Sequence, residues 1–284
     1  MSTITYLPPI DKLLTLGKAE PVIVDNWPNY LELGIGPEHI PDLIRMARDH
    51  EIRSIEPKEG EEEESEFWGP IHAIRALGQL HAETAIEPLV NILAELQDDE
   101  WMLEELPSVY GLIGPAAIPA LAAYLADSSH EMYSRSYAAN ALEEIGKRHP
   151  ESRSESITTL SKQLEAFEEN DYELNAFLIG NLTHLKAVET FPLIERAFKA
   201  DRVDEFVINL DDVLVGFGLK EREVVESPFS ELFKALSASR AKQEEAPSSP
   251  PKTSYNQPPA RKTGEQIIKF SRKKITKKKS KKKR

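Results

Sequence analysis

The chain reads Ala73-Ile-Arg-Ala-Leu-Gly-Gln-Leu80 and then Ala85-Ile-Glu-Pro-Leu89, and a similar pair of segments follows soon after. The second pair is Val109-Tyr-Gly-Leu-Ile-Gly114 with Ala116-Ala-Ile-Pro-Ala-Leu121. Apolar residues in both copies recur at three- and four-residue intervals, which is the period of an amphipathic helix. Each copy therefore predicts a helix, a short turn and a second helix.

The same pattern continues along the chain at a fixed interval. Ile113 follows Leu80 by 33 residues and Ile145 follows Ile113 by 32, while Leu185 follows Leu80 by 105, which is three periods plus an extension. Repeats of this length are typical of stacked helix pairs. We expect the pairs 69–80 with 84–97, 101–113 with 116–126, 132–147 with 153–168 and 172–185 with 188–199, and a last helix near 203–217.

No segment shows the short alternating pattern of a strand between turn dipeptides, so the predicted fold class is all-α. In detail we expect a right-handed α-solenoid of short helix pairs. Four leucines are predicted to lie in its shared core: Leu89, Leu121, Leu142 and Leu182.

These segments resemble HEAT-like repeats, in particular the short variety named after phycobilisome lyases. With Gly36-Pro-Glu-His-Ile-Pro-Asp-Leu-Ile44, Glu105-Leu-Pro107 and Pro192-Leu-Ile-Glu-Arg-Ala-Phe198, the chain looks like an uncharacterised bacterial HEAT-repeat family over roughly residues 5 to 222. Some members of that family end in a Cys-rich metal-binding tail. This chain has no Cys and a Lys-rich end, so metal binding is not implied.

Composition divides the chain into an acidic body and a basic tail. Residues 240–284 hold 16 Lys and Arg against three Glu, which leaves 19 basic and 45 acidic residues in 1–239. Pro and Ser follow Ala246, and a tail with so few apolar residues is expected to be disordered. The predicted organisation is a cap (1–55), an acidic loop (56–67), the helical repeats (68–222), an extension (223–239) and the basic tail (240–284).

The sequence lacks the residue types and motifs that several kinds of site need. The sequence has no Cys, and no two of its seven His are spaced as a zinc pair. Gly34-Ile-Gly36 follows no predicted strand and lacks the Lys of a phosphate loop. No apolar run reaches the roughly 20 residues of a membrane span. We therefore expect a cytoplasmic chain with no cofactor, no metal and no membrane span.

The tail is the clearest charge feature, because ten of its last thirteen residues are basic. Such a segment suits phosphate polymers, whose counterions it releases. A solubilising or localisation arm, or a contact with the acidic body, are the alternatives. The residues assigned to an anionic partner are Arg272, Lys273, Lys274, Lys277, Lys278, Lys279, Lys281, Lys282, Lys283 and Arg284.

Trp68 and Trp101 lie 33 residues apart at equivalent positions, so they could meet on one ridge of the repeat. Core packing and a partner-binding anchor are the two interpretations. Asp98 and Asp99 precede Trp101 where carboxylates favour a helix N-terminus, so capping competes with recognition of a partner.

The second helices are expected to form the working surface, with Glu87, Asn91 and Glu95 on one exposed ridge. The favoured function is a non-catalytic protein-interaction scaffold with a tail for an anionic partner. The alternative is an enzyme of a kind that HEAT-like folds support: a bilin lyase, another chromophore-handling enzyme or a DNA-processing enzyme. Whether the chain has enzymatic activity stays open.

Overall fold

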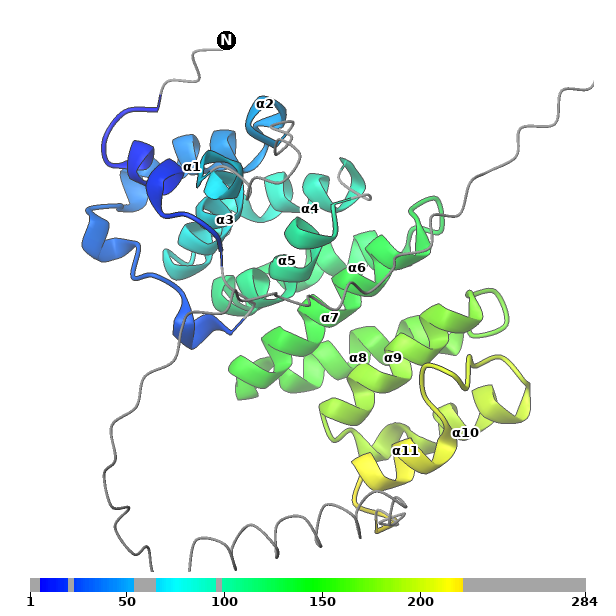
Figure 1. Ribbon diagram of the computed structural model, residues 1–284. Coiled ribbons are helices and arrows are strands. Elements are labelled where there is room, and N and C mark those ends of the chain that lie inside the picture. The colour runs from blue at the N-terminus through cyan, green and yellow to red at the C-terminus, as the bar shows by residue number, and fades with distance from the viewer. Residues whose placement is uncertain (1–5, 20–22, 54–64, 96–98, 222–284) are drawn as a thin grey trace, which may run out of the picture. The chain divides into compact units, whose positions relative to one another are not determined.

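The computed structural model describes residues 6–19, 23–53, 65–95 and 99–221, and these ranges contain helices and turns but no strand (Figure 1). The predicted all-α class is therefore confirmed for the described residues. The last three residues of the expected acidic loop, 65–67, belong to a 3-10 turn, Ser65–Trp68. The rest of that loop, the extension 223–239 and the basic tail 240–284 lie outside the described residues.

Four helix pairs follow the short N-terminal helices α1 (Ile40–Ala47) and α2 (His50–Arg53). We call the leading helix of each pair a first helix and the other a second helix. The first helices are α3 (Gly69–Gln79), α5 (Glu100–Ile113), α7 (Met132–Arg148) and α9 (Tyr172–His184). The second helices are α4 (Ile86–Glu95), α6 (Ile118–Ala126), α8 (Arg153–Glu165) and α10 (Phe191–Lys199).

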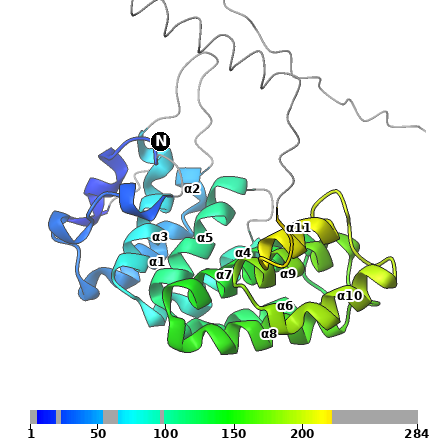
Figure 2. The ribbon, with the colours of Figure 1, turned by 90° about the horizontal axis from the view of Figure 1, so that it is seen from below.

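Helices of one kind pack against their nearest neighbours of the same kind. The first helices contact one another in the order α3, α5, α7, α9, and the second helices in the order α4, α6, α8, α10. Figure 2 shows α8 and α10 on the opposite side of this body from α11 (Leu210–Gly216), which packs on α9. The helix pairs thus form two layers with a shared apolar core.

Among the described residues, two of the four turns between paired helices have the same geometry. After α3, His81 has φ of 49° and Ala82 N–H donates to Leu77 O at 3.1 Å. After α9, Lys186 has φ of 56° and Ala187 N–H donates to Leu182 O at 3.0 Å. Both are left-handed helix ends of the same type, 105 residues apart. The structure thus supports the register that aligned Leu80 with Leu185.

Hydrogen bonds with Gly17, Pro28 and Tyr30 attach the N-terminal segment to α3, and a buried histidine makes two of them. His72 Nε2 lies 3.0 Å from Gly17 O and must donate to it, so Nδ1 accepts from the Tyr30 hydroxyl at 2.8 Å. Burial lowers the pKa of His72 to about 4, which keeps this neutral tautomer at neutral pH. Gln79 adds hydrogen bonds to Pro28 O and from Tyr30 N–H.

The last helix is shorter than the predicted 203–217. Asp204 accepts from Phe206 N–H through its side chain and from Val207 N–H through its carbonyl, so the chain turns here. Asn209 then caps α11 by accepting from Asp212 N–H at 2.9 Å, and the helix begins at Leu210. The turn leaves Val207 and Ile208 beside the first helices instead of inside a helix.

The predicted core is confirmed: Leu89, Leu121, Leu142 and Leu182 are each at most 1% exposed. In the described ranges no single helix is long and apolar enough to cross a membrane. Trp101–Ile113 and Pro115–Ala126 meet that requirement only as a pair, by length and composition, and they are bent by 118° at their junction.

Replacing Leu121 by Ala should lower the free energy of unfolding by about 2–5 kcal/mol, because it leaves a cavity where α6 meets its neighbours. Urea unfolding of the full chain, followed by circular dichroism, measures this loss. Leu219→Ala is the matched control, since Leu219 is 56% exposed, and it should change stability by less than about 0.5 kcal/mol. A loss below about 1 kcal/mol for Leu121→Ala would contradict the assigned core.

Candidate functional site

One face of the first helices carries polar and aromatic residues at helical spacing. On α7 these are Tyr137, Asn140 and Glu144, and the residues 40 positions later on α9 are Phe177, Gly180 and His184. Residues three and four apart lie on the same side of a helix, so each set forms a stripe. Because α7 and α9 are neighbours, the two stripes lie side by side.

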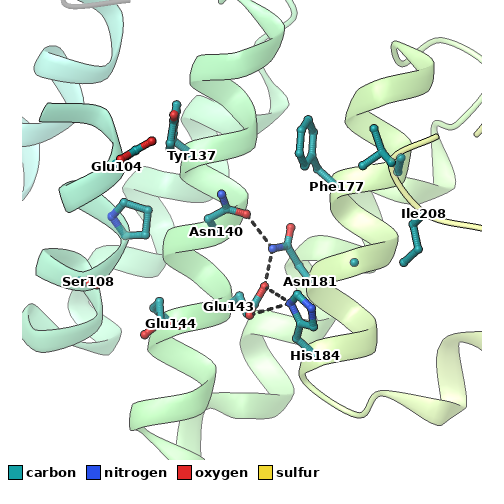
Figure 3. Close-up of a pocket in the computed structure, with 14 residues that line it drawn as sticks. Glu104, Ser108, Tyr137, Asn140, Glu143, Glu144, Phe177, Asn181, His184 and Ile208 are labelled. Atoms are coloured by element: carbon teal, nitrogen blue, oxygen red, sulfur yellow. Dashed lines mark hydrogen bonds and ion pairs between the residues drawn. The ribbon is translucent and has the colours of Figure 1, made fainter. Parts of the chain in front are cut away.

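These stripes line a cavity of about 560 Å³, which we call the first-helix groove (Figure 3). The α5 side of the groove is partly acidic, and the turn after α10 supplies two apolar side chains. The lining residues are Glu104, Pro107, Ser108, Tyr137, Asn140, Glu143, Glu144, Ala176, Phe177, Gly180, Asn181, His184, Val207 and Ile208.

A buried carboxylate forms the centre of the groove floor. Glu143 is 5% exposed and accepts from Asn181 Nδ2 at 2.6 Å. His184 Nδ1 lies 3.1 Å from Oε1 and 3.2 Å from Oε2 of the same carboxylate, and Lys147 pairs with it one turn along α7. Asn181 Nδ2 also donates to Asn140 Oδ1 at 2.8 Å. The network joins α7 to α9 along the groove.

The charges of this network stabilise one another. Burial alone would raise the pKa of Glu143, but hydrogen bonds from His184, Asn181 and Lys147 outweigh it and the pKa is lowered. The hydrogen bond with Glu143 raises the pKa of His184 against the opposing effect of burial. Glu143 is therefore ionised at neutral pH and accepts hydrogen bonds only.

The N-terminal segment covers the corresponding face at α3. Arg75 donates from Nε to Glu105 Oε2 at 2.9 Å and from Nη2 to Oε1 at 2.5 Å, so the ion pair is bidentate and buried. The guanidinium also lies 4.9 Å from the ring centre of Trp27. The polar stripe is thus closed at α3 and open from α5 to α9.

A smaller recess of about 270 Å³ adjoins the groove at its N-terminal side. It shares Ser108 and Glu144 with the groove and adds Arg148 and residues 23–25. Ile23 is 59% exposed at its edge. The open part of the stripe therefore has apolar groups at both ends, Ile23 at one and Val207 at the other.

The two tryptophans meet as expected but differ in exposure. Their ring centres are 5.4 Å apart and the rings are nearly perpendicular, an edge-to-face contact. Trp68 is 1% exposed and Trp101 is 47% exposed. Trp68 therefore belongs to the core and has no surface to offer a partner, which corrects its assignment as a partner-binding residue. Only Trp101 remains available.

The capping interpretation of the acidic cluster is confirmed at Asp99. Its side chain accepts from Met102 N–H at 3.0 Å as the N-cap of α5, and it pairs with Arg53 of α2. Both contacts are structural, because the first caps the N-terminus of α5 and the second attaches the N-terminal segment. Asp98 lies outside the described residues.

Glu87, Asn91 and Glu95 are exposed on α4, opposite the buried Ile86, Leu89 and Leu93, as their spacing predicts. Glu95 is engaged by Arg48 at 2.6 Å. None of these residues lines the first-helix groove. Whether the α4 ridge binds a partner stays a prediction, as does the role of the Lys-rich residues of the tail, which lie outside the described residues.

The sequence prediction places the working surface on the second helices and therefore does not include the groove residues. A signal was present in the sequence, since Tyr137, Asn140 and Glu144 repeat as Phe177, Gly180 and His184 at one constant spacing. That stripe is polar on helices whose other side is apolar. Among the described residues, no group of three His, Asp or Glu side chains could hold a metal ion.

In the part of the chain that the structure describes, the fold and groove define an all-helical protein built from stacked helix pairs with a lined cavity on its first helices. The chain belongs to the family described as "Protein of unknown function (DUF1186)", which matches residues 41–232. This match spans part of the N-terminal segment, all four helix pairs and α11. Neither a curated protein nor a solved structure matches the chain.

The raised pKa of His184 can be tested directly. The NMR titration of its ring should give a pKa above the ordinary 6.5, and Glu143→Gln should lower it, because the charged partner is lost. The stability that His184 contributes should be complete below pH 6.5 and disappear as the pH rises through the raised pKa. The side chain is 64% exposed, so His184→Ala should cost about 0.2–1 kcal/mol at pH 5.5 and less at pH 8.5.

Glu155→Gln provides the matched control, because it removes an exposed carboxylate from α8 without touching the groove. It should leave the His184 pKa unchanged. A His184 pKa at or below 6.5 in the wild-type chain would contradict the ion pair with Glu143.

Proposed function

We propose that the chain is a non-catalytic scaffold that holds a segment of a protein partner in the first-helix groove. In this proposal the stacked helix pairs are short HEAT-like repeats forming a right-handed α-solenoid. The order of contacts from α3 to α9 and from α4 to α10 supports such a stack. The Lys-rich tail adds attraction to an anionic partner.

The main support for the proposal is the open space around Gly180, a residue in the middle of α9. A Cβ at Gly180 would meet no atom within 4 Å, so packing does not require a glycine there. By contrast, a Cβ at Gly111 or Gly146 would approach a neighbouring side chain to 3.0 Å. Glycine inside a helix costs about 0.5–1 kcal/mol relative to Ala. Because Gly180 has no side chain, the groove has open space at this position.

The lining also supports binding of a protein. Tyr137 and Phe177 are half-buried aromatic side chains on facing helices, and Val207 is 45% exposed beside them. Aromatic side chains in a concave surface are typical anchors of protein interfaces. Exposed Glu104 adds a negative charge at the rim.

The enzymatic alternatives receive no such support. A bilin lyase rests on fold-level likeness alone, which does not identify a function. A DNA-processing enzyme needs a surface that attracts phosphate, whereas the groove lining includes the carboxylates of Glu104, Glu143 and Glu144. The α4 ridge of Glu87, Asn91 and Glu95 remains the second candidate surface for a protein.

Gly180→Trp should fill the groove and reduce partner capture at least tenfold, whereas Gly180→Ala should preserve capture and stabilise the chain by about 0.5–1 kcal/mol. The measurement is a quantitative pull-down with the tagged full chain, with urea unfolding of each variant. Glu87→Lys, on the α4 ridge, should leave capture unchanged. Capture that survives Gly180→Trp but fails with Glu87→Lys would move the binding surface to the second helices.

Deleting Arg272 to Arg284 tests the tail. If it binds phosphate polymers, the full chain's affinity for duplex DNA should fall linearly with salt in a log-log plot, with a slope approaching about −9 if ten charges engage. The truncated chain should lose this binding, and DNA sequence should matter little. Fluorescence anisotropy with a labelled duplex gives both results.

A tail that contacts the acidic body predicts a different response to salt. Added salt should then release the tail and increase its sensitivity to protease, while DNA binding stays weak even in dilute buffer. Weak, salt-insensitive DNA binding by the full chain would contradict the phosphate-binding role.

A further inference from the structure

We infer that the first-helix groove recognises a backbone amide of an extended peptide segment through Asn140 and Asn181. This inference rests on the proposed function and names the chemistry of the partner. Glu143 fixes the orientation of both side-chain amides (Figure 3).

The ionised Glu143 carboxylate can only accept a hydrogen bond, so it requires the NH₂ group of Asn181. The 2.6 Å contact from Asn181 Nδ2 to Glu143 Oε2 meets this requirement. Turning the amide over would set its oxygen against the carboxylate. The Oδ1 atom of Asn181 must therefore point away from Glu143.

The orientation of the Asn181 amide also fixes the orientation of the Asn140 amide. Asn181 Nδ2 donates its second hydrogen to Asn140 Oδ1 at 2.8 Å, which leaves Nδ2 of Asn140 directed toward the groove. Among the described residues, this nitrogen has no hydrogen-bond acceptor. Asn140 is half-buried, so the donor is accessible to a ligand.

The side-chain oxygen of Asn181 is unusual because it is buried without a hydrogen-bond partner. Asn181 is 3% exposed, and its Oδ1 has no hydrogen-bond partner among the described residues. Asn175 on the same helix is also buried, but its Nδ2 donates to Phe167 O and Arg202 O, while its Oδ1 accepts from Asn170. Buried polar atoms are normally paired in this way. The unpaired Oδ1 in a groove lining is thus an acceptor without a donor.

A free donor on Asn140 and an unpaired acceptor on Asn181 match the two sides of a peptide bond. The carbonyl of the peptide accepts from Asn140 Nδ2, and an N–H donates to Asn181 Oδ1. The oxygen is covered in the structure, so binding includes a shift of the side chains that cover it.

The rest of the lining selects a peptide over a nucleic acid. Tyr137, Phe177 and Ile208 offer apolar surface to a peptide side chain. Glu104 is exposed and, among the described residues, has no ion-pair partner, so it favours a Lys or Arg of the segment and disfavours phosphate. The occupant is therefore an extended segment of a partner protein with a Lys or Arg that faces Glu104.

The experiment pans a phage-displayed library of random dodecapeptides on the full chain and measures the affinities of the recovered peptides by fluorescence anisotropy. Asn140→Asp retains an acceptor for Asn181 but removes the donor to the ligand, so affinity should fall about tenfold or more. Asn91→Asp makes the same change on exposed α4 and should alter affinity less than about twofold. A melting curve for each variant establishes that it is folded.

A second measurement tests Asn181 without relying on the Asn140 variant. Replacing single peptide bonds of the bound peptide by esters removes one N–H at a time. One ester should weaken binding to the wild-type chain about tenfold and have little further effect on Asn181→Leu, as expected when the two groups interact directly.

The outcomes separate this inference from the proposed function. Peptides that lose binding with Gly180→Trp, but tolerate both Asn140→Asp and every ester, would overturn the amide recognition and leave the groove as the binding surface. Peptides that bind Gly180→Trp as well as the wild-type chain would overturn both. Recovery of no peptide, or displacement of every peptide by oligothymidylate, would also overturn both.

Discussion

The structure depends on the close approach of each first helix to the next. A Cβ added at Gly78 would lie 3.2 Å from Leu112, and one at Gly111 would lie 3.0 Å from Glu144 Cβ. A Cβ at Gly146 would lie 3.0 Å from Leu185. A helix pair has only half of a core, so its apolar face must be covered by the next pair. The glycines let this happen at short range, and the layers of α3 to α9 and α4 to α10 follow.

The same packing accounts for the groove and its polar floor. Because α7 and α9 lie side by side, Glu143 reaches residues about 40 positions later, and the buried charge is matched by Asn181, His184 and Lys147. Removing one partner from such a network leaves a buried charge uncompensated, so the network is costly to disrupt. Gly180 lies beside this network, and packing does not require a glycine there. The groove thus combines a fixed polar floor with open space above it.

Much of the fold could be predicted from sequence, because helical periodicity reports which side of each helix is buried. Leu121 follows from a register of 32 to 33 residues, and the turn at Lys186 follows from the 105-residue spacing that aligns Leu185 with Leu80. The groove could not be predicted in this way. Periodicity does not tell which exposed face is hollow, and the contact of Glu143 with Asn181 depends on the approach of two helices. Trp68 shows the same limit, since its pairing with Trp101 was visible in the spacing but its burial was not.

In the proposed function, a partner occupies the face of the first helices between α5 and α9. Photo-crosslinking locates the partner, with p-benzoylphenylalanine in place of Phe177 in the groove or of Ala123, which is exposed on α6. We expect covalent adducts with partner protein from position 177 and none from position 123. Adducts from position 123, with none from position 177, would contradict the proposed function.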